Sequence, residues 1–185
     1  MSDLVLVAYA TKRGSTREVA EEIAGVLAAA GLPVETCPAG AVESLDGYSG
    51  AVLGGALYMG RVHHDARRFL KRFREPLAAL PTAVFAMGPS SAEEDEIQRS
   101  REQLDRALAA VPEIDPLFVA IFGGVVDPEK LSFQFSRMPA VDARNWDDVR
   151  TWAAGIALVF GARQRAAVAG CSRRRPSPCS EAPGP

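Results

Sequence analysis

The chain has 185 residues, enough for one domain with a sizeable core, and its 48% hydrophobic and 24% charged residues are ordinary for a globular protein. The formal net charge is −2, but residues 163–185 contain five arginines and one acidic residue, which leaves 16 basic and 22 acidic residues in the rest. The excess of acidic residues outside 163–185 argues against a nucleic-acid-binding protein. The lack of any apolar run near ~20 residues argues against a membrane-spanning protein.

The cysteines and the N-terminus indicate a cytoplasmic protein. The three cysteines, Cys37, Cys171 and Cys179, are odd in number, and two of them lie near the C-terminus. This distribution indicates no disulfide framework. The first residues lead directly into an apolar run without the basic region of a secretory signal peptide.

Strand and helix patterns alternate along the chain. Apolar runs typical of strands buried on both faces predict strands at Leu4–Ala10, Gly50–Ala56, Thr82–Met87 and Leu117–Phe122, with a shorter strand at Pro33–Cys37. Helical spacing predicts helices at Ser15–Ala30, Asp65–Leu80, Ala92–Ala110 and Trp146–Phe160. Pro76 should break or restart the second helix, Ser91 and Glu94 form a capping-box pattern, and Asn145 is a suitable N-cap.

This alternation predicts an α/β fold with a doubly wound, five-stranded parallel sheet and helices on both faces. Residues 1–162 form its single domain, and residues 163–185, rich in Arg, Pro and Ser, are expected to be a disordered tail. Ligands of such sheets bind beyond the carboxyl ends of the strands. The loops to consider are therefore Thr11–Thr16, Gly55–His64, Gly88–Ser91 and Gly123–Lys130.

The first loop joins a strand directly to a helix, where backbone N–H groups and the helix dipole favour an anion. Its single glycine, Gly14, fits neither of the common pyrophosphate-binding patterns, and the hydroxyls of Thr11, Ser15 and Thr16 suit one terminal monophosphate. Lys12 and Arg13 add positive charge or point into solvent. The alternative is an ordinary helix start capped by Ser15 or Thr16.

The second loop surrounds an aromatic side chain and a thioether with glycines, which suits a flat ring lying against backbone. Tyr58 either stacks on such a ring or packs in the core. His63 and His64 are the only histidines, and adjacent residues of a helix cannot both face one site, so we predict no metal site. His63 either contacts the ligand or bonds to backbone at a helix start.

The third and fourth loops offer backbone rather than charged groups. Gly88, Pro89 and Ser90 supply amides and a hydroxyl before the next helix, while Gly123 and Gly124 let backbone approach a ligand closely. Four such loops at one edge of a sheet indicate a ligand site more strongly than any one of them.

The segment from Thr11 to Thr16, followed by a Gly/Tyr loop and Gly88-Pro89, resembles flavodoxins. More narrowly, residues 55–61, His63, Gly123-Gly124 and residues 145–153 resemble the flavodoxin-domain family of menaquinone-dependent protoporphyrinogen IX dehydrogenases. The resemblance covers about residues 4–160. Two features depart from that family: Val62 stands where an aromatic residue is usual, and the segment between Phe133 and Asn145 is shorter.

The resemblance implies non-covalent FMN, with its phosphate in the first loop and its ring between the second and third. The residues so implied are Thr11, Lys12, Arg13, Gly14, Ser15, Thr16, Ala56, Leu57, Tyr58, Met59, Gly60, Gly88, Pro89, Ser90, Gly123, Gly124 and Val125. It also implies an FMN-dependent oxidoreductase of haem biosynthesis, which takes hydrogen from a porphyrinogen and passes electrons to a quinone at the inner membrane surface. His63 is the one candidate for a proton acceptor.

Two other functions stay open. A flavodoxin-like electron carrier would have no substrate of its own and would dock with redox proteins; the acidic residues 93–96 fit such a surface weakly. A chain that folds but binds no flavin is the third hypothesis, and Val62 and the shortened segment favour it.

Overall fold

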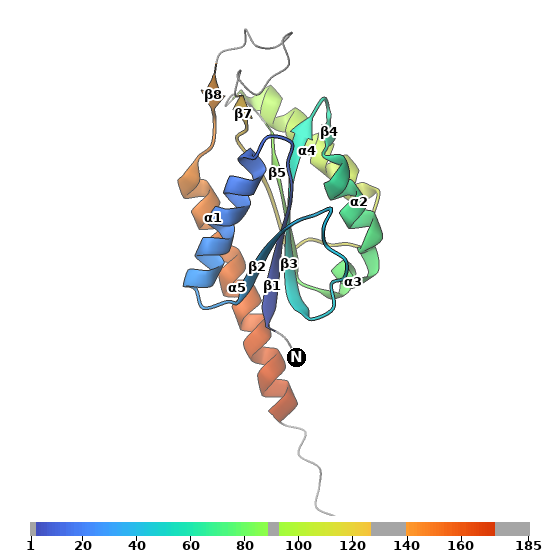
Figure 1. The fold of residues 1–185 in the computed structure, drawn as a ribbon, viewed down its shortest axis with the longest axis vertical. Helices are drawn as coiled ribbons and strands as arrows, with labels where there is room; N and C mark the ends of the chain where they lie inside the picture. Colours follow the sequence, from blue (N-terminus) through green and yellow to red (C-terminus); the bar gives the residue numbers. More distant parts are fainter. Residues whose placement is uncertain (1–2, 89–92, 127–139, 173–185) are drawn as a thin grey trace, which may run out of the picture.

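The computed structural model describes residues 3–88, 93–126 and 140–172. Its core is a parallel sheet of five strands in the order β2-β1-β3-β5-β6 (Figure 1). The strands are β1 (Leu4–Ala10), β2 (Val34–Pro38), β3 (Tyr48–Tyr58), β5 (Thr82–Met87) and β6 (Phe118–Phe122). The predicted doubly wound sheet is confirmed, because consecutive strands are placed first on one side of β1 and then on the other.

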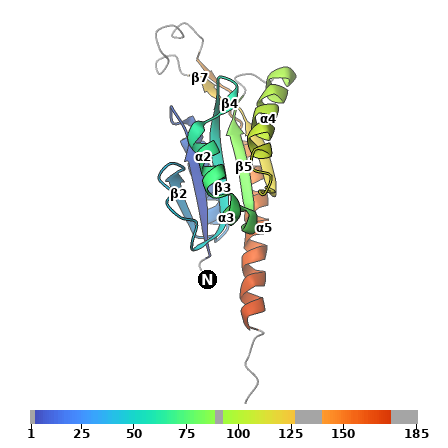
Figure 2. The same cartoon turned by 90° about the vertical axis from the view of Figure 1, so that its right-hand side faces the viewer.

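Helices cover both faces of the sheet (Figures 1 and 2). One face carries α1 (Ser15–Ala29) and α5 (Trp146–Ser172), and the other carries α2 (His64–Arg72), α3 (Arg74–Ala79) and α4 (Glu94–Ala109). The side chains of β1 show how the sheet packs against both helix layers. Val5 and Val7 are fully buried against the α1 and α5 side, and Leu6 and Ala8 are fully buried against the other. A strand with two buried faces reads as the continuous apolar run seen in the sequence.

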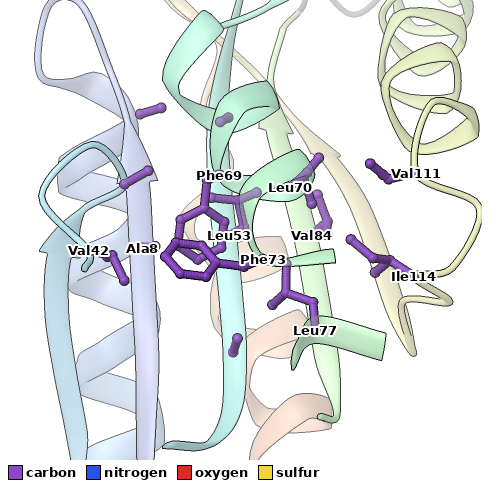
Figure 3. Packing of buried hydrophobic residues seen from close by; sticks show 14 of the residues in the cluster. Ala8, Val42, Leu53, Phe69, Leu70, Phe73, Leu77, Val84, Val111 and Ile114 are labelled. Carbon is purple, nitrogen blue, oxygen red and sulfur yellow. The ribbon is translucent and has the colours of Figure 1, made fainter. Parts of the chain in front are cut away.

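In the layer beneath α2 and α3, large side chains from those helices pack against strand residues such as Leu53 and Val84 (Figure 3). Phe69, Leu70 and Leu77 are almost fully buried there, and the rings of Phe69 and Phe73 lie 4.9 Å apart. On the opposite face, Trp152 of α5 meets Phe85 and Phe122 edge to face. Burial of each large side chain contributes about 1.5–3 kcal/mol, so these layers fix both helix pairs on the sheet.

The predicted helix 65–80 is two helices that meet at Phe73. Pro76 lies in the first turn of α3, where its missing N–H would have no acceptor within the helix. Proline therefore restarts the helix here, one of the two outcomes predicted. Asn145 is confirmed as a cap, because its Oδ1 accepts hydrogen bonds from the N–H groups of Asp147 and Asp148. Ser91 lies outside the described residues.

The structure adds a short hairpin and a second antiparallel strand pair that the sequence pattern did not predict. The end of β3 pairs antiparallel with β4 (Arg61–Val62), so β3 extends two residues beyond Ala56 to Tyr58. β7 (Val125–Val126) pairs antiparallel with β8 (Val141–Asp142). Both strand pairs lie at the end of the molecule where the parallel strands finish (Figure 1).

The helix that begins at Trp146 continues past Phe160 to Ser172 and projects beyond the sheet (Figures 1 and 2). The prediction that a disordered tail begins at residue 163 is therefore wrong for residues 163–172. Their Ala, Arg and Gln residues have high helix propensity despite the lack of large apolar side chains. The rest of the predicted tail lies outside the described residues. Within the described part of the chain, no helix is both long and apolar enough to cross a membrane.

Two glycines test how tightly the sheet is packed. A Cβ at Gly54 would lie inside contact distance of the Phe85 ring, its partner on β5, whereas a Cβ at Gly25 on α1 would meet nothing within 4 Å. We expect Gly54→Ala to lower the free energy of unfolding by about 1–3 kcal/mol through overpacking. The control Gly25→Ala should raise it by about 0.5–1 kcal/mol. Urea denaturation measures both, and equal effects would contradict this account.

Candidate functional site

A cleft of ≈ 410 Å³ lies where β1, β3 and β5 end, which is the edge that the fold predicts for a ligand. Its volume falls within the range of small-molecule sites. Residues from all four predicted loops line it: Thr11, Lys12, Arg13, Ser15, Ala56, Leu57, Tyr58, Met59, His63, Met87, Gly88, Gly124, Val125 and Val126. Of the residues predicted for the cofactor, Pro89 and Ser90 lie outside the described part of the chain.

The loop after β1 turns sharply into α1 without a side-chain cap. Gly14 occupies the N-cap position with φ +98°, a left-handed conformation that favours glycine, and its N–H donates to Thr11 Oγ1 at 2.9 Å. No side chain accepts a hydrogen bond from the start of the helix. The alternative in which Ser15 or Thr16 caps α1 is therefore wrong. The first N–H groups of α1 form the positive end of an uncapped helix.

Thr16 gives the strongest indication of a missing partner. Its side chain is fully buried, and its Oγ1 is the one buried side-chain oxygen or nitrogen without a hydrogen bond among the described residues. Thr82 is equally buried, yet its Oγ1 lies 3.1 Å from the carbonyl oxygens of Leu77 and Leu80. An unpaired buried hydroxyl costs about 1–3 kcal/mol. An anionic oxygen held at the start of α1 would supply the missing acceptor.

The β3–β4 hairpin forms another wall of the cleft. Its turn is the pair Met59-Gly60, with φ +47° and +77°, values typical of a two-residue hairpin turn. Tyr58 is 43% exposed and Met59 is 84% exposed, so the alternative of a core tyrosine is wrong. The Lys12 ammonium lies 4.8 Å from the centre of the Tyr58 ring, which places a cation on one face of that ring.

Val62, which departs from the narrower family, does not line this cleft. It is 4% exposed, it pairs with Leu57 across the hairpin, and it packs under Gly55, where an added Cβ would lie 3.0 Å from Val62 Cγ1. A valine here therefore acts as a core residue of the hairpin.

His63 is a half-buried N-cap of α2 that also lines the cleft. Its N–H donates to the Ala56 carbonyl at 2.8 Å, and its Nδ1 accepts a hydrogen bond from the Asp65 N–H at 3.3 Å. The prediction of a histidine bonded to backbone at a helix start is confirmed. Burial lowers the pKa of His63, while Asp65 partly offsets this effect. The ring is thus held neutral, with Nδ1 already engaged as an acceptor.

His63, His64 and Asp65 offer side-chain ligand atoms that all lie within 4.8 Å of one another. The expectation that the two histidine side chains cannot face the same site is wrong. His63 precedes the helix, and the centre of its ring lies 5.3 Å from that of His64. The cap made by His63 and the 3.0 Å contact between His64 Nε2 and Asp65 Oδ1 account for this cluster.

The far side of the cleft is built from the ends of β5 and β6. The Gly88 N–H donates to the Phe122 carbonyl at 3.0 Å, and an added Cβ at Gly88 would lie 2.8 Å from both Leu57 Cδ1 and Ser100 Oγ. Gly123 does not line the cleft, since its Cα packs directly against the carbonyl group of Ala143. Gly14, Thr16 and Gly60 also lie outside the lining; Gly14 is the N-cap of α1 and Thr16 lies in its first turn.

Two features of this edge were not found from the sequence. Met87 lines the cleft at the end of β5, a position that could have identified it. Arg144 is also central: its guanidinium binds Asp142 and Glu18, and it lies 4.8 Å from the centre of the Trp146 ring. These hydrogen bonds lower the pKa of Asp142 and join β8 to α1. No short-range pattern marks a contact between residues so far apart in the chain.

The strand order, together with a cleft over an uncapped first helix, defines a flavodoxin-like α/β protein. A family model described as the flavodoxin domain matches residues 6–138, and the chain belongs to that family. A sequence comparison with curated proteins gives no significant match.

Solved structures agree with this fold. A mutant of flavodoxin from Pseudomonas aeruginosa has TM-score 0.55 and 20% identity, covering 85% of this chain and 99% of its own. Oxidised flavodoxin 2 from Bacillus cereus has TM-score 0.54 and 21% identity, with 88% and 99% covered. The flavodiiron protein from Giardia intestinalis has TM-score 0.58 and 10% identity, covering 87% of this chain and 37% of its own.

The two buried threonines make a matched pair for measurement. We expect Thr16→Val to keep or raise the free energy of unfolding of the ligand-free protein, by up to about 1 kcal/mol, because it removes an unpaired hydroxyl. Thr82→Val should lower it by about 1 kcal/mol, because its hydroxyl is hydrogen-bonded. Urea denaturation without ligand measures both. A loss at Thr16 as large as that at Thr82 would show that Thr16 has a partner within the protein.

His63 should make stability depend on pH. Because its folded pKa lies below the ordinary 6.5, the unfolded chain takes up the proton first as the pH falls. The free energy of unfolding should therefore decrease below about pH 6.5 and level off once the folded protein is protonated too. His63→Asn keeps an N-cap acceptor and should remove this slope, whereas His63→Ala should also lose about 1 kcal/mol at neutral pH. Denaturation across this pH range would contradict the account if the His63→Asn slope were unchanged.

Proposed function

We propose that this chain binds FMN in the cleft, with the phosphate at the start of α1, and serves as a flavin-dependent redox protein. The observation that carries the proposal is the buried, unpaired Thr16 hydroxyl beside an uncapped helix start. Together they provide one hydroxyl that lacks a hydrogen-bond acceptor and the N–H groups of the first turn of α1, to which a phosphate would bind. Membership of the flavodoxin domain family supports a flavin as the group that carries this phosphate.

The residues around the cleft divide by chemistry. Thr11 and Ser15, which line the cleft, and the buried Thr16 next to Ser15 would hold the phosphate. Lys12 and Arg13, also in the lining, would balance its charge. Of the other residues proposed for the cofactor, Ala56, Leu57, Tyr58, Met59, Gly88, Gly124 and Val125 line the cleft. Gly14, Gly60 and Gly123 lie outside the lining, and Pro89 and Ser90 lie outside the described residues. The exposed Tyr58 and Met59 and the apolar Leu57 and Val125 suit the edge and faces of a flat ring. Bound FMN would supply one-electron and hydride transfer, while the protein places it and excludes water from one side.

Between the two finer functions, the geometry best supports electron transfer without a substrate of the protein's own. A hydrogen-removing enzyme needs a proton acceptor, and the described residues that line the cleft include no carboxylate. His63 is the remaining candidate, but its Nδ1 accepts the hydrogen bond that caps α2. An electron carrier needs no such group.

A second candidate is an FMN-dependent oxidoreductase of the menaquinone-dependent protoporphyrinogen IX dehydrogenase type. The sequence segments 55–61 and 145–153 favour it, and the cleft is open enough at Tyr58 and Met59 for a substrate to approach. His63 would then give up its cap to accept a proton. A porphyrinogen and a quinone would be its partners, in place of a redox protein.

Titration with FMN tests the cofactor. The protein should retain the flavin absorbance after desalting. Thr16→Val should weaken FMN binding at least about tenfold through the loss of a charge-assisted hydrogen bond, while leaving the fold intact. Thr16→Ser, which keeps the hydroxyl, serves as the control and should bind within a fewfold of the original chain. A colourless protein with the expected circular dichroism would favour the hypothesis of a fold that binds no flavin.

Turnover separates the two redox functions. A carrier should leave a reduced porphyrin unoxidised when a quinone is supplied, yet exchange electrons with a reduced redox protein in stopped-flow absorbance. The enzyme should oxidise the porphyrin at a rate that falls by ~100-fold or more in His63→Asn, the scale of a lost general base. Porphyrin oxidation in the original chain would overturn the assignment as a carrier.

A further inference from the structure

A second cleft, of ≈ 240 Å³, lies between β4, α2 and α4, and the β3–β4 hairpin contributes to both clefts. Residues with positive side chains dominate its lining: Arg61, Arg67, Lys71 and Arg106. Val62, Gln103, Ala107, Ala110 and Gly60 complete it, so none of its lining residues is acidic. We call this the basic cleft.

The cations of the basic cleft are only partly balanced within the described part of the protein. Arg106 contacts Glu102 at 3.3 Å in an exposed pair, which contributes little at high dielectric. Arg61 and Lys71 form no ion pair with described residues. Four like charges around one concavity repel one another, and a bound anion would remove this cost.

Part of the basic cleft is held in place before any ligand binds. Arg67 Nε donates to the Val62 carbonyl at 3.0 Å, which fixes a half-buried guanidinium against the hairpin. Its remaining N–H groups keep their fork geometry, which matches carboxylate and phosphate oxygens. Gln103 adds a half-buried amide donor, and Ala107 adds a small apolar surface. The cleft is smaller than the 410 Å³ cleft proposed for FMN, which we call the cofactor cleft, and it suits a compact ligand.

We propose that the basic cleft binds a compact dianion, either a phosphate group or a dicarboxylate, at a site separate from the cofactor. Three guanidinium groups and one ammonium surround a small volume without an acidic lining residue, which is the chemistry that recognises paired negative oxygens. The proposal does not rest on flavin binding. It can therefore fail while FMN binding succeeds, and the reverse.

Two-dimensional ¹H–¹⁵N NMR of the flavin-free protein tests the proposal, with inorganic phosphate and malonate as probes in separate titrations. At least one probe should shift the amide signals of Gly60, Arg61 and residues 103–110. The shifts at the basic cleft should persist in Thr16→Val, which alters only the start of α1. They should weaken about tenfold or more in affinity in the double variant Arg61→Gln/Lys71→Gln.

The matched control is Arg68→Gln/Arg101→Gln, which removes two exposed arginines from α2 and α4 that do not line the basic cleft. It removes the same net charge and should bind the probe within about twofold of the original chain, since exposed charges that do not line the cleft are screened by solvent and salt. Tighter binding of phosphate or of malonate assigns the chemical class. The proposal is overturned if both probes shift only the signals of residues 14–16, or if the control loses as much affinity as the cleft variant.

Discussion

The turn from β1 into α1 is the constraint on which the rest of the site depends. β1 is hydrogen-bonded to β2 on one side and to β3 on the other, and α1 is anchored to the sheet by the fully buried Val19, Ile23 and Leu27. Between these two anchored elements, Gly14 takes a left-handed conformation and the Thr16 hydroxyl is buried without an acceptor. The packing of the sheet thereby stabilises a helix start that is ready for an anion before any anion binds.

The β3–β4 hairpin contributes residues to both clefts. Tyr58 and Met59 face the cofactor cleft, Gly60, Arg61 and Val62 line the basic cleft, and Met59 holds a left-handed φ of +47° that non-glycine residues rarely adopt. The hydrogen bond from the His63 N–H to the Ala56 carbonyl continues the hairpin into α2. A group bound in either cleft would therefore contact the same short hairpin.

The sequence predicted the parallel strands well because burial on both faces leaves an uninterrupted apolar run, and β1 and β5 have the predicted bounds. It did not predict the β3–β4 hairpin, because a turn of Met59-Gly60 lacks the Asn-Gly or Asp-Gly signal of such turns. Composition also led to a wrong prediction for residues 163–172. Their few apolar side chains suggested disorder, although most of these residues have high helix propensity. The basic cleft and the Arg144 contacts arise from residues on separate elements, and only the folded chain brings them together.

His63 shows how the fold limits the chemistry of the cofactor cleft. As an N-cap it contributes about 1 kcal/mol to α2 through an Nδ1 that must stay unprotonated, and burial lowers its pKa in the same direction. A proton accepted at Nδ1 would remove the cap and charge a half-buried ring next to the Lys12 cation, whose field also lowers the pKa of His63. Each of these effects opposes service as a base near neutral pH. The same effects favour a neutral His63 ring whose Nδ1 is already hydrogen-bonded, which suits a site that passes electrons and leaves proton transfer to solvent.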